Sequence, residues 1–187
     1  MRRSRLVVLA AGFLCAGFFA APARATTQET YQLIARYVLE TVRAFRTAYV
    51  LNVVEHTKDA GLAPNEHWAK DVHAVPLPAQ FVKAAASDLD TFEIGLISLL
   101  PIYESNRPKT DAEAEALRQL SADRTKKLLT FMDGTQFKAL APDVAVSQTC
   151  ADCHNSHPRS PWRSFKKGDM LGAVILRIDA PPERQGP

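Results

Sequence analysis

The run Cys150-Ala151-Asp152-Cys153-His154 constrains this chain more tightly than any other feature of its sequence. Two thiols three positions apart can reach the two vinyl groups of one haem and form a thioether bond with each. The next residue is then placed under the iron, where its imidazole nitrogen becomes the proximal ligand. The spacing therefore predicts one covalently attached haem c, held by Cys150 and Cys153, with His154 bound to the iron.

Three other interpretations of these residues are open at this point. A zinc ion could take Cys150, Cys153, His154 and His157 as four ligands, although adjacent Cys153 and His154 are awkward tetrahedral partners. A thioredoxin-like redox pair needs the motif between a strand and a helix in an early βα unit, whereas this motif lies late in the chain. A plain disulfide between the two cysteines would leave His154 without a role.

The first 25 residues resemble a cleaved secretory signal. Three arginines among the first five residues precede an apolar run over 6–21, and Ala23-Arg24-Ala25 offers small residues where a signal peptidase cuts. The run is shorter than the about 20 apolar residues that a retained membrane anchor needs. We therefore expect cleavage after Ala25, a periplasmic protein, and no stable membrane span in the remainder. This agrees with the motif, because c-type haem is attached outside the cytoplasm, and Cys15 leaves with the signal.

Removal of this segment changes the charge balance of the chain. Residues 1–25 contain four of the 23 basic side chains and none of the 20 acidic ones, so 19 basic and 20 acidic groups remain. A net charge near −1 provides no basic excess of the kind that binds nucleic acid. Residues 26–187 are numerous enough for one domain with a hydrophobic core.

Residues 28 to about 60 are predicted to form one long amphipathic helix. Apolar side chains recur there at steps of three and four residues, which places them on one face. Gly61 is a suitable C-terminal stop, and Pro64 prevents the helix from continuing. A second helix is expected over about 80–90. The expected apolar face consists of Ile34, Val38, Val42, Phe45, Tyr49 and Val53, and the expected solvated face of Glu29, Arg36, Glu40, Arg43 and Arg46.

Strand signals dominate the second half of the chain. Residues 92–100 form a short, apolar, β-prone run, and residues 170–179 form another. Segments 127–132 and 135–140 flank an Asp-Gly dipeptide, which is a strong hairpin signal. Helices followed by a small antiparallel sheet with inserted helices indicate the α+β class. A strand so close to the C-terminus does not suit the all-helical bundle of cytochromes c′, whose haem motif lies similarly late.

One further helix is expected between these strands. Residues 110–113, Thr-Asp-Ala-Glu, have the form of a capping box, so a short helix over 112–121 should follow. We expect Glu104, Glu113 and Glu115 to be solvated charges of this helix and of the loop before it.

Runs of residues beyond the haem motif make up a recognisable set. They are His154-Asn155-x-His157-Pro158, Ser160-Pro161, Lys167-Gly168-Asp169 and Leu171-Gly172, and upstream Tyr49, Asn52-Val53, Val75-Pro76-Leu77-Pro78-Ala79, Phe81 and Pro142-Asp143-Val144-Ala145-Val146. With the motif, this set resembles a family of bacterial c-type haem domains with a PAS-like fold, over essentially the whole of 26–187. The family occurs alone in exported proteins and as the sensory part of histidine kinases and chemoreceptors. The resemblance implies a small antiparallel sheet flanked by helices, with a long N-terminal helix.

The resemblance also carries ligand roles over to this chain. It assigns haem attachment to Cys150 and Cys153 and the proximal ligand to His154. Relatives draw the second axial ligand from the N-terminal helix, in some cases as a cysteine, but no spare cysteine remains here after signal removal. We expect His56, on the predicted N-terminal helix, to be the sixth ligand, with His73 before the Pro-Leu-Pro turn as the alternative.

Other candidates for the second axial position are weaker. Met170 and Met132 are softer ligands, and methionine would raise the redox potential. An open coordination position is the remaining alternative. His157 follows His154 too closely to reach the other face of the haem, so we expect it to bond a propionate or the local backbone.

Two functions follow from this interpretation of the sequence. In the first, the haem changes redox state or takes up a small gaseous ligand, and the domain passes the change to an unidentified redox or signalling protein. In the second, the chain carries electrons between periplasmic redox partners. Enzymatic activity of the peroxidase type is not expected, because the sequence offers no obvious distal acid–base groups.

Overall fold

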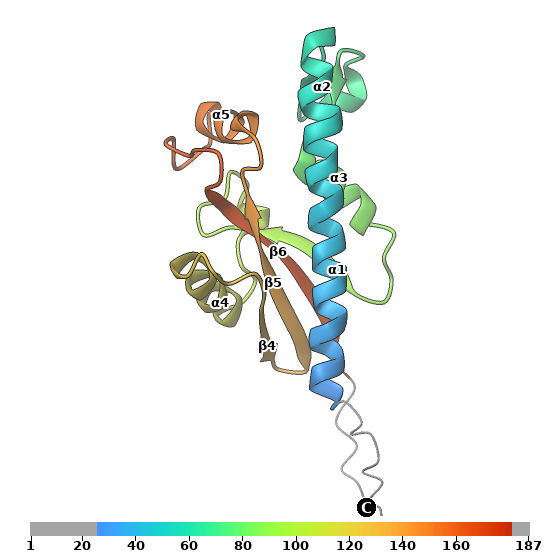
Figure 1. Cartoon of the computed structure of the whole chain (residues 1–187), viewed down its shortest axis with the longest axis vertical. Coiled ribbons are helices and arrows are strands. Elements are labelled where there is room, and N and C mark those ends of the chain that lie inside the picture. The colour runs from blue at the N-terminus through green and yellow to red at the C-terminus, as the bar shows by residue number, and fades with distance from the viewer. Residues whose placement is uncertain (1–25, 181–187) are drawn as a thin grey trace, which may run out of the picture.

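The computed structural model describes residues 26–180, and its longest element is a helix at the N-terminal end (Figure 1). Helix α1 spans Thr27–Tyr49 and continues through a π-helical turn at Val50–Val54 into α2 (Glu55–Thr57) and a 3₁₀ turn at Lys58–Ala60. Gly61 then ends the helix in the left-handed conformation, with φ of 75°. The predicted helix over 28–60 and its stop at Gly61 are confirmed.

A capping box starts α1. The Thr26 hydroxyl accepts a hydrogen bond from the Glu29 amide, and the Glu29 carboxylate accepts one from the Thr26 amide. These bonds satisfy backbone donors that the first helical turn leaves without partners. The expected signal peptide, residues 1–25, lies outside the described residues, as do residues 181–187.

Four antiparallel strands form the central sheet in the order β3-β6-β5-β4. They are β3 (Glu93–Ile97), β4 (Leu129–Asp133), β5 (Gln136–Val144) and β6 (Met170–Asp179). The predicted hairpin joins β4 to β5, and Asp133 pairs with Gln136 across a turn in which Gly134 has a φ of 60°. The α+β class, the small antiparallel sheet and the long N-terminal helix are confirmed.

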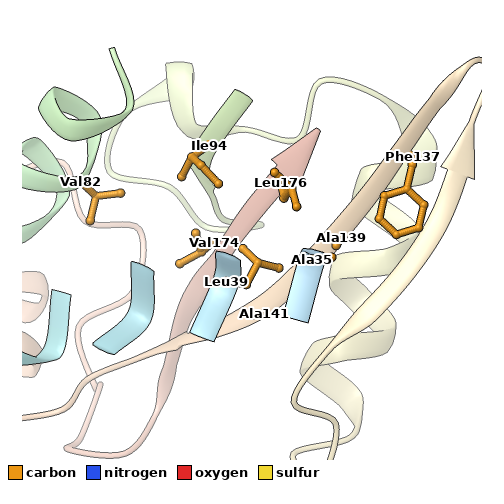
Figure 2. Packing of buried hydrophobic residues seen from close by; sticks show 9 residues of the cluster. All are labelled: Ala35, Leu39, Val82, Ile94, Phe137, Ala139, Ala141, Val174 and Leu176. Atoms are coloured by element: carbon orange, nitrogen blue, oxygen red, sulfur yellow. The ribbon is translucent and has the colours of Figure 1, made fainter. Parts of the chain in front are cut away.

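Helices cover both faces of this sheet. On one face, α1 packs against β5 and β6, and α3 (Pro78–Ala86) packs against β3; Figure 2 shows Ala35 and Leu39 of α1 near Ala139, Ala141 and Val174. On the other face, α4 (Asp111–Ala122) buries its apolar side against alternate residues of the same strands. Successive side chains of a strand point to opposite faces, so β5 and β6 supply both cores.

Two assignments of side chains to faces need correction. The buried face of α1 contains Ala35, Leu39 and Arg46, whereas Ile34 and Phe45 are exposed. Arg46 was expected in solvent, but it lies seven residues after Leu39 and therefore on the same side of the helix. Glu113, also expected in solvent, is fully buried on the sheet side of α4.

The remaining elements gather at one end of the sheet. Short parallel strands β1 (Ala63–Pro64) and β2 (Ala74–Val75) follow the long helix, and α5 (Gln148–Ser156) connects β5 to β6. Sequence analysis did not predict α5, which lies beyond the sheet and across from the upper part of the long helix (Figure 1). Among residues 26–180, no helix is both long enough and apolar enough to cross a membrane.

Candidate cofactor-binding site

Helix α5 carries the Cys-x-x-Cys-His motif and fixes the direction of its three side chains. Ser147 caps the helix by accepting a hydrogen bond from the Cys150 amide. Residues three and four positions apart share one face of a helix, so Cys150, Cys153 and His154 point to the same side. Val50 of the long helix and Leu171 of β6 pack with Cys150 and hold α5 against the domain.

The three motif side chains line a pocket at the end of the sheet. The empty space of this pocket is about 1010 Å³, part of it open to solvent. Its walls come from six segments that are far apart in the sequence, and their apolar side chains include Leu77, Leu96, Ile97, Leu100, Ile102 and Leu171. Ligand pockets are lined in this way, mainly by apolar groups with a few polar ones.

Close backbone contact requires glycine at one position in the pocket wall. A Cβ atom on Gly172 of β6 would lie 2.4 Å from the carbonyl oxygen of Ile97 on β3, so only glycine fits there. The pairing of β5 with β6 is irregular beside it, because Asp143 pairs with Gly172 and Val144 with Met170. The bulge leaves Leu171 as the extra residue, and its side chain joins the pocket lining.

His154 is held as a neutral imidazole. Burial, together with the smaller effect of the positive charges of Arg46 and His157, lowers the pKa of His154 to about 4. Phe165 packs edge-on against the imidazole, with ring centroids 5.7 Å apart. A neutral imidazole has the free nitrogen lone pair that a metal ligand needs.

The state of the two thiols bears on the other interpretations of the motif, and covalent attachment stays a prediction. Cys150 and Cys153 are both free, so the structure contains no disulfide between them. Burial raises the pKa of Cys153, whereas a thiol of the thioredoxin type needs a lowered one. Within residues 26–180, no three His, Cys, Asp or Glu side chains are grouped to hold a metal ion, which gives the zinc interpretation no support.

Sequence comparisons add an independent result. The model of the Tll0287-like family matches residues 24–179. The chain belongs to the Tll0287-like family. A solved structure, that of the cyanobacterial haem protein Tll0287, matches over 87% of this chain and 100% of its own, with a TM-score of 0.53 and 16% sequence identity. The comparison with curated proteins gives no match.

Several residues that carry the family resemblance are in contact beside the pocket of this Tll0287-like protein. The Tyr49 ring stacks on Phe81 of α3 with centroids 4.5 Å apart, and its hydroxyl donates a hydrogen bond of 2.6 Å to the Pro76 carbonyl. These contacts tie the segment before α3 to the long helix. Leu77 and Pro78 of the same segment line the pocket, so this set of residues helps to build its wall.

A polar cluster stands at the pocket rim. The carboxylate of Glu66 lies 2.8 Å from His157 Nε2 and 3.6 Å from the Arg159 guanidinium, which in turn lies over the Tyr103 ring. Hydrogen bonds from Tyr103 and His157 lower the pKa of Glu66. His157 also accepts a hydrogen bond from the Arg159 amide, so the expected backbone contact is present. Sequence analysis missed Glu66 and Tyr103, which carry no local signal of this role.

A second polar group in the lining is a buried ion pair. The Arg46 guanidinium lies 3.0 Å from Asp143 Oδ1, with the two side chains 7% and 13% exposed. Burial raises the pKa of Asp143, although the charges of Arg46 and Arg43 oppose that shift. The pairing was not foreseen, but the phase of the helix would have placed Arg46 on its inner side.

The structure places the expected second ligands outside this lining. His56 is exposed on α2, and His73 is exposed in the loop before β2. Met132 is exposed on β4, and Met170 lies at the start of β6 without lining the pocket. A π turn adds a residue to the helical repeat, so Val50–Val54 rotates every residue after it, including His56. The role of His56 as sixth ligand, with His73 as the alternative, stays a prediction.

Proposed function

We propose that this chain is a periplasmic, monohaem, c-type cytochrome-like protein that senses redox state or a small ligand through its haem. The observation that carries the proposal is the grouping of two free thiols and a neutral imidazole on one side of a large apolar pocket. Thioether bonds to Cys150 and Cys153 would hold one haem, and His154 would bind its iron. The haem bound by the structural relative supports the same cofactor here.

Attachment through both sulfurs suits the position of the motif. Cys150 is buried against the domain core, while Cys153 and His154 are half-buried and line the pocket. When bound, the haem supplies an iron that can change redox state or take a ligand. The protein's own residues orient it: α5 fixes the proximal side, and apolar walls exclude water from the macrocycle.

The proposed location rests on the expected signal peptide. Helix α1 begins at Thr27 with Thr26 as its N-cap, directly after the expected cleavage site at Ala25. A mature protein beginning at Thr26 would keep the whole capping box. Mass spectrometry of protein exported to the periplasm should give the mass of residues 26–187 plus one haem, and a mass that includes residues 1–25 would contradict cleavage.

Sensing is preferred to catalysis because of the groups in the pocket. The acid–base pair of the lining is Glu66 and His157, and His157 follows the expected proximal ligand His154 too closely to reach the other face of the haem, where a peroxidase needs its acid and base. Electron transfer between periplasmic partners is the alternative, and it suits an iron with two protein ligands. In either case we expect a redox or signalling protein as partner.

The attachment experiment uses protein matured in a host that attaches c-type haem. Haem should stay with the wild-type polypeptide in acid acetone, and its pyridine haemochrome spectrum should have the position typical of two thioethers. Cys150→Ser and Cys153→Ser should each shift that spectrum toward the single-thioether position, whereas Ser156→Ala, on the same helix, should leave it unchanged. A colourless wild-type protein, or haem fully extracted by acid acetone, would contradict the proposal.

Absorption spectra separate sensing from electron transfer. Sharp, split visible bands on reduction would indicate a low-spin iron with two axial ligands and favour an electron carrier. A high-spin spectrum that shifts with carbon monoxide would indicate an open position and favour ligand sensing. The same spectra of His56→Ala and His73→Ala test the second ligand, because loss of the true ligand converts a low-spin iron to high spin.

A further inference from the structure

Arg46 reaches the pocket with one strong hydrogen-bond donor unused. Its side chain is 7% exposed and lines the pocket from the inner face of α1. One terminal nitrogen lies 3.0 Å from Asp143 Oδ1, but the Nε atom is buried and has no hydrogen-bond partner within residues 26–180. A buried donor of this kind costs about 1–3 kcal/mol when it is left unsatisfied. The donor therefore indicates a partner that the polypeptide itself does not supply.

Asp143 does not use all the hydrogen-bond donors of the Arg46 guanidinium. Arginine offers five N–H donors in a planar fork, and a carboxylate that pairs fully with it uses two of them in parallel. Here a single contact joins the two side chains. The Arg46 side chain, which lines the pocket, therefore keeps its positive charge and hydrogen-bond donors that Asp143 does not use.

The other charged groups around the pocket are already engaged. Glu66 is bonded to His157 and lies near Arg159 at the rim, so this cluster supplies its own charge balance. Among the described residues that line the pocket, Arg46 is thus the cation with a vacant donor.

The long helix presents this cation to the pocket. Of its residues, Arg46 and Val54 line the pocket. A guanidinium keeps its proton at any physiological pH and has no lone pair to give to iron. The helix can therefore stabilise a ligand by a charge-assisted hydrogen bond, but it cannot coordinate the metal from these positions.

We propose that Arg46 is the anion-binding residue of this pocket, and that it holds a small inorganic monoanion coordinated to the haem iron. The inference rests on the proposed function, because the anion needs an iron to bind. The N–H groups of the guanidinium donate to the anion, and its charge offsets the anion's charge in a pocket with apolar walls. Azide is the probe of this class, and carbon monoxide is the neutral ligand for comparison.

Azide titration of the ferric holoprotein, followed by its absorption spectrum, tests the proposal. Arg46→Met should weaken azide binding by about 10-fold to 100-fold, the range expected when a hydrogen bond to a charged group is lost. The affinity of the ferrous protein for carbon monoxide should change far less, because a neutral ligand gains little from the charge. Asp143→Asn should strengthen azide binding, because it removes the counter-charge of Arg46.

Arg43→Met is the matched control. Arg43 lies one turn before Arg46 on the same helix, and its charge acts on Asp143, but it does not line the pocket. We expect its azide affinity to match that of the wild type. If Arg46→Met does not fold, Arg46→Lys keeps the charge and loses the planar fork, so it should bind azide with intermediate affinity.

The outcomes separate this inference from the proposed function. If the pyridine haemochrome is absent, the proposed function fails before any titration is made. If haem is attached but the wild type binds no azide, or binds it as tightly as Arg46→Met does, the inference is wrong and the proposed haem attachment still stands. A shift of the reduction potential in Arg46→Met with unchanged azide affinity would assign Arg46 to a haem propionate and would equally overturn the inference.

Discussion

Two buried arginines of this protein sit in opposite environments. Arg177 on β6 donates to both carboxylate oxygens of Glu113, at 2.7 and 2.8 Å, and its third nitrogen donates to Glu93 at 2.7 Å. Arg46 on α1 makes one contact with Asp143 and keeps a buried N–H without a partner among residues 26–180. The first arginine joins elements of the fold to one another, whereas the second faces a pocket.

The difference lies in the hydrogen-bond donors: in one ionic cluster every buried donor has a partner, and in the other a donor is left for a ligand. Lys138 completes the Glu113 cluster by donating to Glu113 and Asp133, so α4 is bonded to two strands through fully paired charges. Such a cluster costs much to break but has nothing to offer a ligand. The Arg46–Asp143 pair is also buried, but its unused donor gives it a role beyond holding the fold together.

The largest effect is expected from Glu113→Gln. This change leaves Arg177 and Lys138 buried without their shared carboxylate, so the free energy of unfolding should fall by about 3–5 kcal/mol. Urea unfolding followed by circular dichroism measures it. Glu115→Gln, on the exposed side of the same helix, is the control and should leave the midpoint unchanged. Equal midpoints for the two variants would show that the cluster does not stabilise the fold.

Acid should weaken the same cluster in a defined pH range. Burial alone would raise the pKa of Glu113, but hydrogen bonds from Arg177 and Lys138 outweigh it and lower the pKa from 4.5 to about 2. A carboxyl with a lowered folded-state pKa stabilises the protein above its unfolded-state pKa, and this contribution is lost as the pH falls. The shift corresponds to a contribution of order 3 kcal/mol.

The measurement for this prediction is the unfolding free energy of the wild type minus that of Glu113→Gln, between pH 6 and pH 2. The difference should stay constant down to about pH 4.5 and then shrink toward pH 2. A difference that is independent of pH over this whole range would mean that the pKa of Glu113 is the same in the folded and the unfolded protein.

Replacement of both members of an ion pair should affect stability differently at the two buried arginines. Arg46→Met with Asp143→Leu removes both charges of the pocket pair, and the unfolding free energy should stay within about 1 kcal/mol of wild type or rise. Arg177→Met with Glu113→Leu leaves Lys138 buried beside an apolar residue and should destabilise the protein. Thermal unfolding of the two holoproteins provides the comparison, which fails if both double variants lose stability equally.

The smallest effect is expected at the edge of the Glu113 cluster. Lys109 donates to Glu93 at 2.7 Å, but its side chain is 59% exposed. Lys109→Gln should therefore lower the unfolding free energy by less than about 1 kcal/mol. A larger loss would mean that the exposed ion pair between Lys109 and Glu93 stabilises the protein as strongly as the buried members of the cluster do.

Local sequence signals were sufficient for much of the fold. The period of apolar residues predicted the long helix, Gly61 its end, and the Asp-Gly dipeptide the β4–β5 hairpin. The spacing of Cys150, Cys153 and His154 fixed which side chains would share one side of the site. Each of these features depends on residues that are close together in the chain, so a local pattern in the sequence is enough to predict it.

Features that depend on distant segments were missed. Arg46 and Glu113 were assigned to solvent because they are charged, but each is buried with partners from another element, Asp143 for the first and Arg177 for the second. The pocket lining comes from six separate segments, which no local pattern could bring together. Helix α5 was also missed, because its nine residues are too few and too polar for a clear period.

The π turn at Val50–Val54 divides the long helix into two parts with different constraints. Before it, α1 is packed along the sheet and cannot rotate without disturbing the core. After it, the direction of every side chain up to Gly61 is set by one inserted residue, since each helical residue turns the chain by about 100°. Loss of a single residue here would re-aim the upper part of the helix as a unit. Insertion or loss of one residue at this turn would therefore let related proteins place different side chains beside the same pocket.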